Sequence, residues 1–210
     1  MDLELWLAFA VASAVLLAIP GPTVMVVVAQ ALARGRASGW ITVPGVVLGD
    51  FTAMTISLAG AGAVLAASAT LFTALKLAGA AYLIWLGIQL WRNPPQALEP
   101  SALDTETGRQ TNRRLFWQSY VVTALNPKSI VFFVAFVPQF LDPTAPLLVQ
   151  FVVLEATFLA LAGLNTALWA VAAGALRSRI GRPSVLRAMA RTGAGFLIGA
   201  GVLTALARRA

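Results

Sequence analysis

Long runs of apolar residues separated by short polar segments dominate the sequence. Six such runs follow one another, at about 5–33, 40–66, 70–91, 115–140, 146–176 and 190–207. About 20 apolar residues cross the hydrocarbon core of a bilayer as a helix, because a helix satisfies its own backbone hydrogen bonds. The pattern therefore predicts an all-α integral membrane protein with six transmembrane helices.

Prolines interrupt the first and fourth runs near their middles. The first run contains Pro20, Gly21 and Pro22, and the fourth contains Asn126 and Pro127. Proline lacks a backbone donor and clashes with the preceding turn, so we expect both helices to break and to leave backbone groups without helical partners. Such groups can bind a solute, and a helix that restarts after a break favours a carboxylate. A kink that serves packing alone is the alternative.

The two halves of the chain share uncommon residues at constant offsets. An offset of 105 positions relates Pro22 to Pro127, Asp50 to Glu155, and Thr52 to Thr157. An offset of 114 superposes Gly79-Ala80 on Gly193-Ala194, Leu83-Ile84 on Leu197-Ile198, and Gly87 on Gly201. Three helices per half is an odd number, so the halves would form inverted repeats, an arrangement typical of secondary transporters. Chance matching within an Ala-, Leu- and Gly-rich sequence is the alternative.

A polar stretch divides the two halves. Residues 92–114 contain prolines, acids and arginines, which indicates a cytoplasmic linker. The predicted domains are therefore a first three-helix repeat at 1–91, the linker at 92–114, and a second three-helix repeat at 115–210.

The net charge of +7 arises mainly from arginines between the apolar runs. Most of them fall in the first, third and fifth connections, which predicts that these loops are cytoplasmic and that both termini lie outside. The charge thus has a topological explanation that needs no nucleic acid partner. Asp2 and Glu4 stand where a cleaved leader carries basic residues, so we expect the first run to be a retained span.

The sequence contains no cysteine and no histidine. Disulfides, thiolate chemistry, zinc sites and a histidine-dependent catalytic apparatus are therefore excluded or nearly so. We expect neither a cofactor nor a metal site, and no enzymatic activity.

Three ionisable residues lie well inside the apolar runs, namely Asp50, Lys128 and Glu155. Each costs about 2.5–3.5 kcal/mol at the centre of a bilayer, so each needs a compensating role. One hypothesis is a neutralising ion pair between Lys128 and either acid. The other is functional: a buried carboxyl group alternates between a proton and the ammonium of a substrate, while Lys128 meets its carboxylate. Further polar residues can line a cavity or bond within the bundle: Thr23, Gln30, Thr52, Tyr120, Thr157 and Asn165.

Several short motifs occur in a fixed order along nearly the whole chain. They are Pro20-Gly21-Pro22, Arg34-Gly35, Gly39, Gly45, Gly49-Asp50, the run from Ala80 to Gly87, Asn126-Pro127-Lys128, Phe132-Phe133 and Pro138-Gln139-Phe140. Together they resemble the lysine exporter / homoserine-threonine efflux (LysE/RhtB) family. The resemblance implies a bacterial inner-membrane exporter of amino acids that exchanges them for protons. Thr23 departs from the Asn or Gly that usually follows Pro-Gly-Pro.

The resulting hypothesis is an alternating-access exporter of amino acids or close derivatives, in the bacterial cytoplasmic membrane, driven by proton antiport. Its partners would be the amino acid, protons and membrane lipid, and assembly into a homo-oligomer is left open. Two alternatives remain: a divalent cation exporter, and a membrane-embedded lipid-processing or lipid-flipping protein.

Overall fold

The computed structural model describes residues 2–67, 69–93, 112–142, 145–175 and 183–206, and every regular element among them is a helix. The α-helices are α1 (Leu3–Ala18), α2 (Pro22–Arg34), α3 (Gly39–Ala67), α4 (Ala69–Arg92), α5 (Asn112–Ala124), α6 (Pro127–Val131), α7 (Leu147–Ala175) and α9 (Pro183–Leu206). Two short 3₁₀ helices, η1 (Arg36–Ser38) and η4 (Val137–Phe140), and a π-helical turn, η3 (Phe132–Phe136), complete them. The predicted all-α class is confirmed.

Several of these helices have the length and hydropathy of membrane spans. Among the described residues three segments qualify singly, at Arg36–Gly60, Asn112–Phe140 and Leu147–Ala173. The bent pair of α1 and α2 makes a fourth if it is one span, and Ala190–Leu206 is a shorter apolar helix. The chain thus has the helices of a membrane protein, and the full number of six spans stays a prediction.

The first span breaks between α1 and α2, where the chain bends by 53°. Gly21 caps the start of α2 and Pro22 is its first residue, a position where the missing N–H of proline has no helical partner to lose. The interruption therefore falls where the prolines predict it.

The fourth predicted span is interrupted more mildly, between α5 and α6. The Asn126 side chain accepts a hydrogen bond from the Lys128 backbone N–H at 3.1 Å and so caps α6. Asn112–Phe140 still qualifies as one span. The fourth helix is thus interrupted at its proline without a sharp bend.

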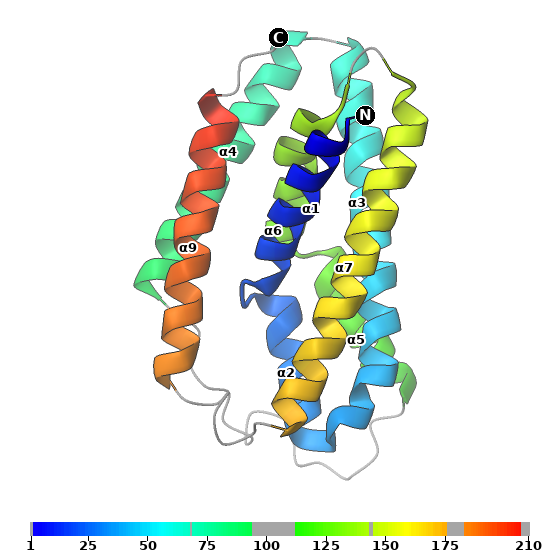
Figure 1. Ribbon diagram of the computed structural model, residues 1–210, viewed down its shortest axis with the longest axis vertical. Coiled ribbons are helices and arrows are strands. Elements are labelled where there is room, and N and C mark those ends of the chain that lie inside the picture. Colours follow the sequence, from blue (N-terminus) through cyan, green and yellow to red (C-terminus); the bar gives the residue numbers. More distant parts are fainter. Residues whose placement is uncertain (1, 68, 94–111, 143–144, 176–182, 207–210) are drawn as a thin grey trace.

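The helices form a bundle with the broken segments inside it (Figure 1). α1, α2 and α6 occupy the centre, α4 and α9 pair on one side, and α3 packs against α5 and α7 on the other. α2, α4 and α7 run toward the end of the bundle from which α3, α5 and α9 start, while the N-terminus and the end of α9 lie at the opposite end.

A cluster of aromatic rings holds the centre of the bundle together. Phe132 and Phe133 are fully buried in the π-helical turn, and Phe158 of α7 packs edge-on against Phe133 with ring centroids 4.8 Å apart. Buried rings of this kind contribute strongly to core stability. They fix the segment that follows α6 against α7, and thereby the position of the second break.

α4 and α9 pack on each other reciprocally. A Cβ atom added at Gly87 would lie 2.8 Å from the carbonyl oxygen of Ala194, and one added at Gly201 would lie 2.7 Å from that of Ala80. The offset of 114 positions converts the first contact into the second. The glycines allow close approach of the two backbones, as small residues do between membrane helices.

We expect Gly201→Ala to destabilise the protein by about 1–3 kcal/mol, because its methyl group would overlap the α4 backbone. Gly199→Ala is the matched control in the same helix, since a Cβ there meets nothing within 4 Å. Thermal unfolding of the two purified variants in detergent measures the difference. Equal midpoints would contradict the close packing.

Candidate functional site

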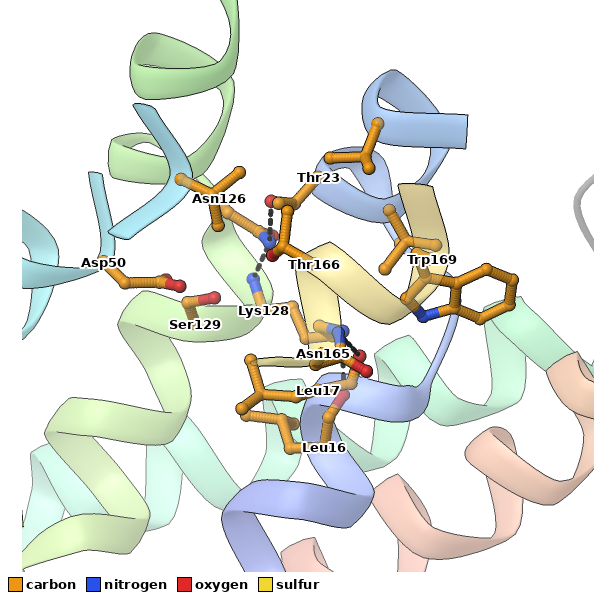
Figure 2. A pocket seen from close by; sticks show the side chains of 14 residues that line it. Leu16, Leu17, Thr23, Asp50, Asn126, Lys128, Ser129, Asn165, Thr166 and Trp169 are labelled. Carbon is orange, nitrogen blue, oxygen red and sulfur yellow. Dashed lines mark hydrogen bonds between the residues drawn. The ribbon is translucent and has the colours of Figure 1, made fainter. Parts of the chain in front are cut away.

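A small polar cavity lies at the break between α1 and α2 (Figure 2). Residues of α3, the second break, α6 and α7 complete its wall. Its lining is Leu16, Leu17, Gly21, Thr23, Val24, Val27, Val46, Asp50, Asn126, Lys128, Ser129, Asn165, Thr166 and Trp169. The cavity volume is about 20 Å³, enough for roughly one water molecule. An amino acid therefore requires the surrounding helices to separate.

The Lys128 ammonium is bound to carbonyl oxygens that the first break exposes. Its Nζ donates to Leu16 O at 3.1 Å and to Ile19 O at 3.0 Å. Pro20 has no N–H to donate to Leu16 O four residues earlier, and this oxygen instead accepts from the Ile19 backbone N–H at 3.2 Å as well as from Lys128. The carbonyl end of a helix also attracts a cation through its dipole. Lys128 is thus held by the backbone of α1.

Gly21 lets this ammonium approach the start of α2. A Cβ at Gly21 would lie 3.3 Å from Lys128 Nζ and 3.6 Å from Cε. The ammonium therefore sits between the carbonyl end of α1 and the amide end of α2. Two of its three N–H donors are used by α1, which leaves one for a ligand.

Asp50 reaches the same cavity from α3. The residue is 2% exposed, and its Oδ1 has no hydrogen-bond partner within the described part of the chain. Nor does an ion pair join Lys128 to Asp50 or Glu155 in those residues, so neither ion pair considered from the sequence is formed. A buried acceptor without a partner is costly. A proton or the ammonium of a ligand would satisfy it.

Hydrogen bonds between side chains link the two breaks. Asn126 Nδ2 donates to Thr23 Oγ1 at 3.3 Å, and Thr123 Oγ1 donates to the same oxygen at 3.2 Å. From α7, Asn165 Nδ2 donates to Leu17 O at 3.0 Å and so binds a further carbonyl at the end of α1. Thr23, Asn126 and Asn165 therefore line the cavity and also hydrogen-bond across the broken ends.

Glu155 does not share this cavity. It is half-buried in α7, where its Oε1 accepts a hydrogen bond from Thr55 at 2.7 Å. Asn165, which does line the cavity, lies ten residues further along α7, about 15 Å along the helix axis. The two acids that match in sequence are therefore separated in the fold.

Glu155→Gln is accordingly expected to retain more than half of the transport activity, because Gln can still accept the hydrogen bond from Thr55. Initial rates of solute uptake into everted membrane vesicles, corrected for expression, measure it. A loss as large as that caused by Asp50→Asn would show that both acids serve one site.

The other polar candidates bond between helices outside the cavity. They are Gln30 with Gln118 at 3.1 Å, Thr52 with Tyr120 at 3.4 Å, and Trp6 with Thr157 at 2.9 Å. Pro20, Pro22 and Pro127 act through the backbone breaks, since none of the three lines the cavity.

Sequence reasoning did not identify several lining residues. Ser129 and Thr166 each follow a candidate residue directly, so their proximity to Lys128 and Asn165 was the available signal. Trp169, Val27 and Val46 had no such signal, because apolar residues are everywhere in this chain. The carbonyl of Leu16 could have been found, since it lies four residues before Pro20.

The fold and the site together define a class: a helical membrane protein whose buried polar site is built at discontinuous helices. Membrane transporters commonly build their sites in this way. Among the described residues there is no group of three or more Asp or Glu side chains that could hold a metal ion.

Comparison with known proteins identifies the family. The LysE type translocator family profile matches residues 14–208, and the chain belongs to this family. It is 32% identical over 208 residues to a membrane protein of Vibrio cholerae serotype O1. The matched residues make up 99% of this chain and all of that protein. It is also 32% identical over 212 residues, the full length of both chains, to the homoserine/homoserine lactone efflux protein of Salmonella typhi. The leucine efflux protein of Enterobacter sp. is 30% identical over 144 residues, 68% of this chain and 66% of that protein. No solved structure matches the chain.

Proposed function

We propose that this protein exports amino acids or close derivatives across the bacterial cytoplasmic membrane, by alternating access coupled to proton antiport. The observation that carries the proposal is that one cavity at the helix break is lined by two groups of opposite charge: the Lys128 ammonium, and the buried Asp50 carboxyl group with an unpartnered oxygen. These charges complement the two charged groups of an amino acid. The relatives named as homoserine and leucine efflux proteins support the same substrate class.

The architecture in this proposal is six spans in two inverted three-helix repeats. The reciprocal contacts of Gly87 and Gly201 between α4 and α9 support it, as do the interruptions at equivalent prolines. α3 and α7, which carry Asp50 and Glu155, also pack against each other and run in opposite directions. Most of the linker at 92–114 lies outside the described residues, so the domain boundaries stay predictions.

The orientation follows from the basic connections. η1 and the helix ends that flank the third and fifth connections lie at one end of the bundle (Figure 1). We place this end in the cytoplasm because of its arginines, and both termini outside. The cavity then lies between the two sides, as alternating access requires.

In the proposed cycle, ionised Asp50 binds the substrate ammonium from the inside. The free N–H of Lys128 and the amides at the start of α2 bind the carboxylate. A proton arriving from outside neutralises Asp50 and releases the substrate there. Loss of that proton to the inside restores the starting state. One pH unit can drive about a tenfold gradient for each proton exchanged.

Everted membrane vesicles test this function directly. We expect vesicles containing the protein to accumulate at least one of a panel of labelled amino acids when their interior is made acidic, and to lose this accumulation when an ionophore collapses the pH gradient. Vesicles without the protein are the control. Amino acid uptake that does not depend on the pH gradient would contradict proton coupling but would still support amino acid export. Uptake of Mg²⁺ or Mn²⁺ and of no amino acid would favour the cation exporter.

A further inference from the structure

The cavity has a charged level and an apolar wall at different heights in the bundle. Lys128 lies at the level of the break, beside Gly21, and Asp50 lines the same cavity. Val46 precedes Asp50 by four residues in α3, and Trp169 follows Asn165 by four residues in α7. α3 and α7 run in opposite directions, so both residues are displaced by about 6 Å toward the same end of the bundle, the end at which α2 terminates (Figure 1).

The apolar wall is continuous with a second core cluster. Val24 and Val27 of α2 complete the wall, and Val27 and Val46 are each 1% exposed. Behind them pack Val28, Ala31, Ala170 and Ala173, all buried. Within the described chain Asp50 and Lys128 are the only charged residues that line the cavity (Figure 2). A charged group placed against this wall would therefore find no counter-ion.

We propose that Val27, Val46 and Trp169 form the side-chain subsite and restrict transport to amino acids with uncharged side chains. This inference rests on the proposed function. The charges at the break are already matched by the substrate's own ammonium and carboxylate, so a third charge would be buried unpaired, at a large cost in free energy. An aliphatic side chain instead gains from leaving water against the valines.

The test uses purified wild-type protein in proteoliposomes loaded with unlabelled amino acid. Exchange is measured separately for labelled leucine, homoserine, lysine and glutamate. We expect leucine or homoserine to exchange at least about 100-fold faster than lysine or glutamate at equal concentration. Lysine or glutamate exchanged as fast as the neutral amino acids would overturn the subsite, while amino acid export would stand. Exchange of no amino acid would instead contradict the proposed function.

A gain-of-function variant sharpens the test. Val46→Asp places a carboxylate one turn from Asp50 on the wall, and we expect it to raise lysine exchange at least tenfold over wild type. Val46→Ala is the matched control, because it enlarges the cavity without adding a charge. We expect this variant still to exclude lysine. Size-exclusion chromatography establishes that each variant folds. A folded Val46→Asp protein that still excludes lysine would contradict the assignment, and if the variant does not fold, the wild-type comparison decides.

Discussion

Replacing Lys128 by methionine is expected to abolish transport and to lower the stability of the protein. The ammonium makes two charged hydrogen bonds, to Leu16 O and Ile19 O, at the end of α1. Without them the two carbonyl groups lose their buried cation, at a cost of about 3 kcal/mol. The substrate carboxylate also loses the one positively charged partner that the described residues offer it in the cavity, so transport fails in folded protein as well.

Thermal unfolding in detergent and uptake into everted vesicles measure the two effects. Lys76→Met is the matched control: it removes the only other lysine of the sequence, which lies in α4 and does not line the cavity. In the double variant Asp50→Asn with Lys128→Met, the stability loss should be smaller than the sum of the single losses, because no uncompensated carboxylate remains. Transport should stay absent. A Lys128→Met protein that exports at the wild-type rate would rule out a role for this ammonium in substrate binding.

Asp50→Asn is expected to uncouple transport from the proton gradient while leaving the protein folded and inserted. The amide has nearly the same shape as the buried carboxyl group but cannot take up a proton in the relevant pH range. Labelled substrate should therefore equilibrate across everted vesicles without accumulating when the interior is made acidic. The loss of the charged hydrogen bond to the substrate ammonium should also raise KM about tenfold.

Counterflow separates this result from simple inactivation. Asp50→Asn proteoliposomes preloaded with unlabelled substrate should still exchange it for labelled substrate, because exchange requires no net proton movement. As the control, vesicles that contain the Glu155→Gln protein should accumulate substrate under the same pH gradient. Undiminished gradient-driven accumulation by Asp50→Asn would remove Asp50 from the coupling mechanism.

The two proline breaks could be located from the sequence, but the bend at each break could not be predicted. Pro20 cannot donate to the carbonyl four residues earlier, so a break near Ile19 and the loss of the usual helical donor to Leu16 O follow from the sequence alone. The severity of each break does not. The first span bends by 53°, whereas Asn112–Phe140 qualifies as one span. In the fourth span Asn126 caps the new helix, and the aromatic cluster after α6 holds it against α7.

Which of the two matching acids lines the cavity could not be predicted from the sequence. Asp50 and Glu155 occupy equivalent positions in the two halves, and the sequence pattern treats them alike. The residue 105 positions before Lys128 is Thr23, so one half brings a cation to the break and the other a hydroxyl. The cavity forms around that cation, with Asp50 in its wall and Glu155 bonded to Thr55 elsewhere.

Hydropathy and backbone hydrogen bonding are properties of short stretches of chain, and so the sequence by itself determined the helical membrane class, the positions of the breaks and the motifs of the LysE type translocators. Only the tertiary structure decided that Lys128 binds the end of α1, that Asp50 is the acid beside it, and that valines and Trp169 close the cavity. Those contacts depend on how each helix is rotated and placed against helices far away in sequence. No local pattern encodes that geometry.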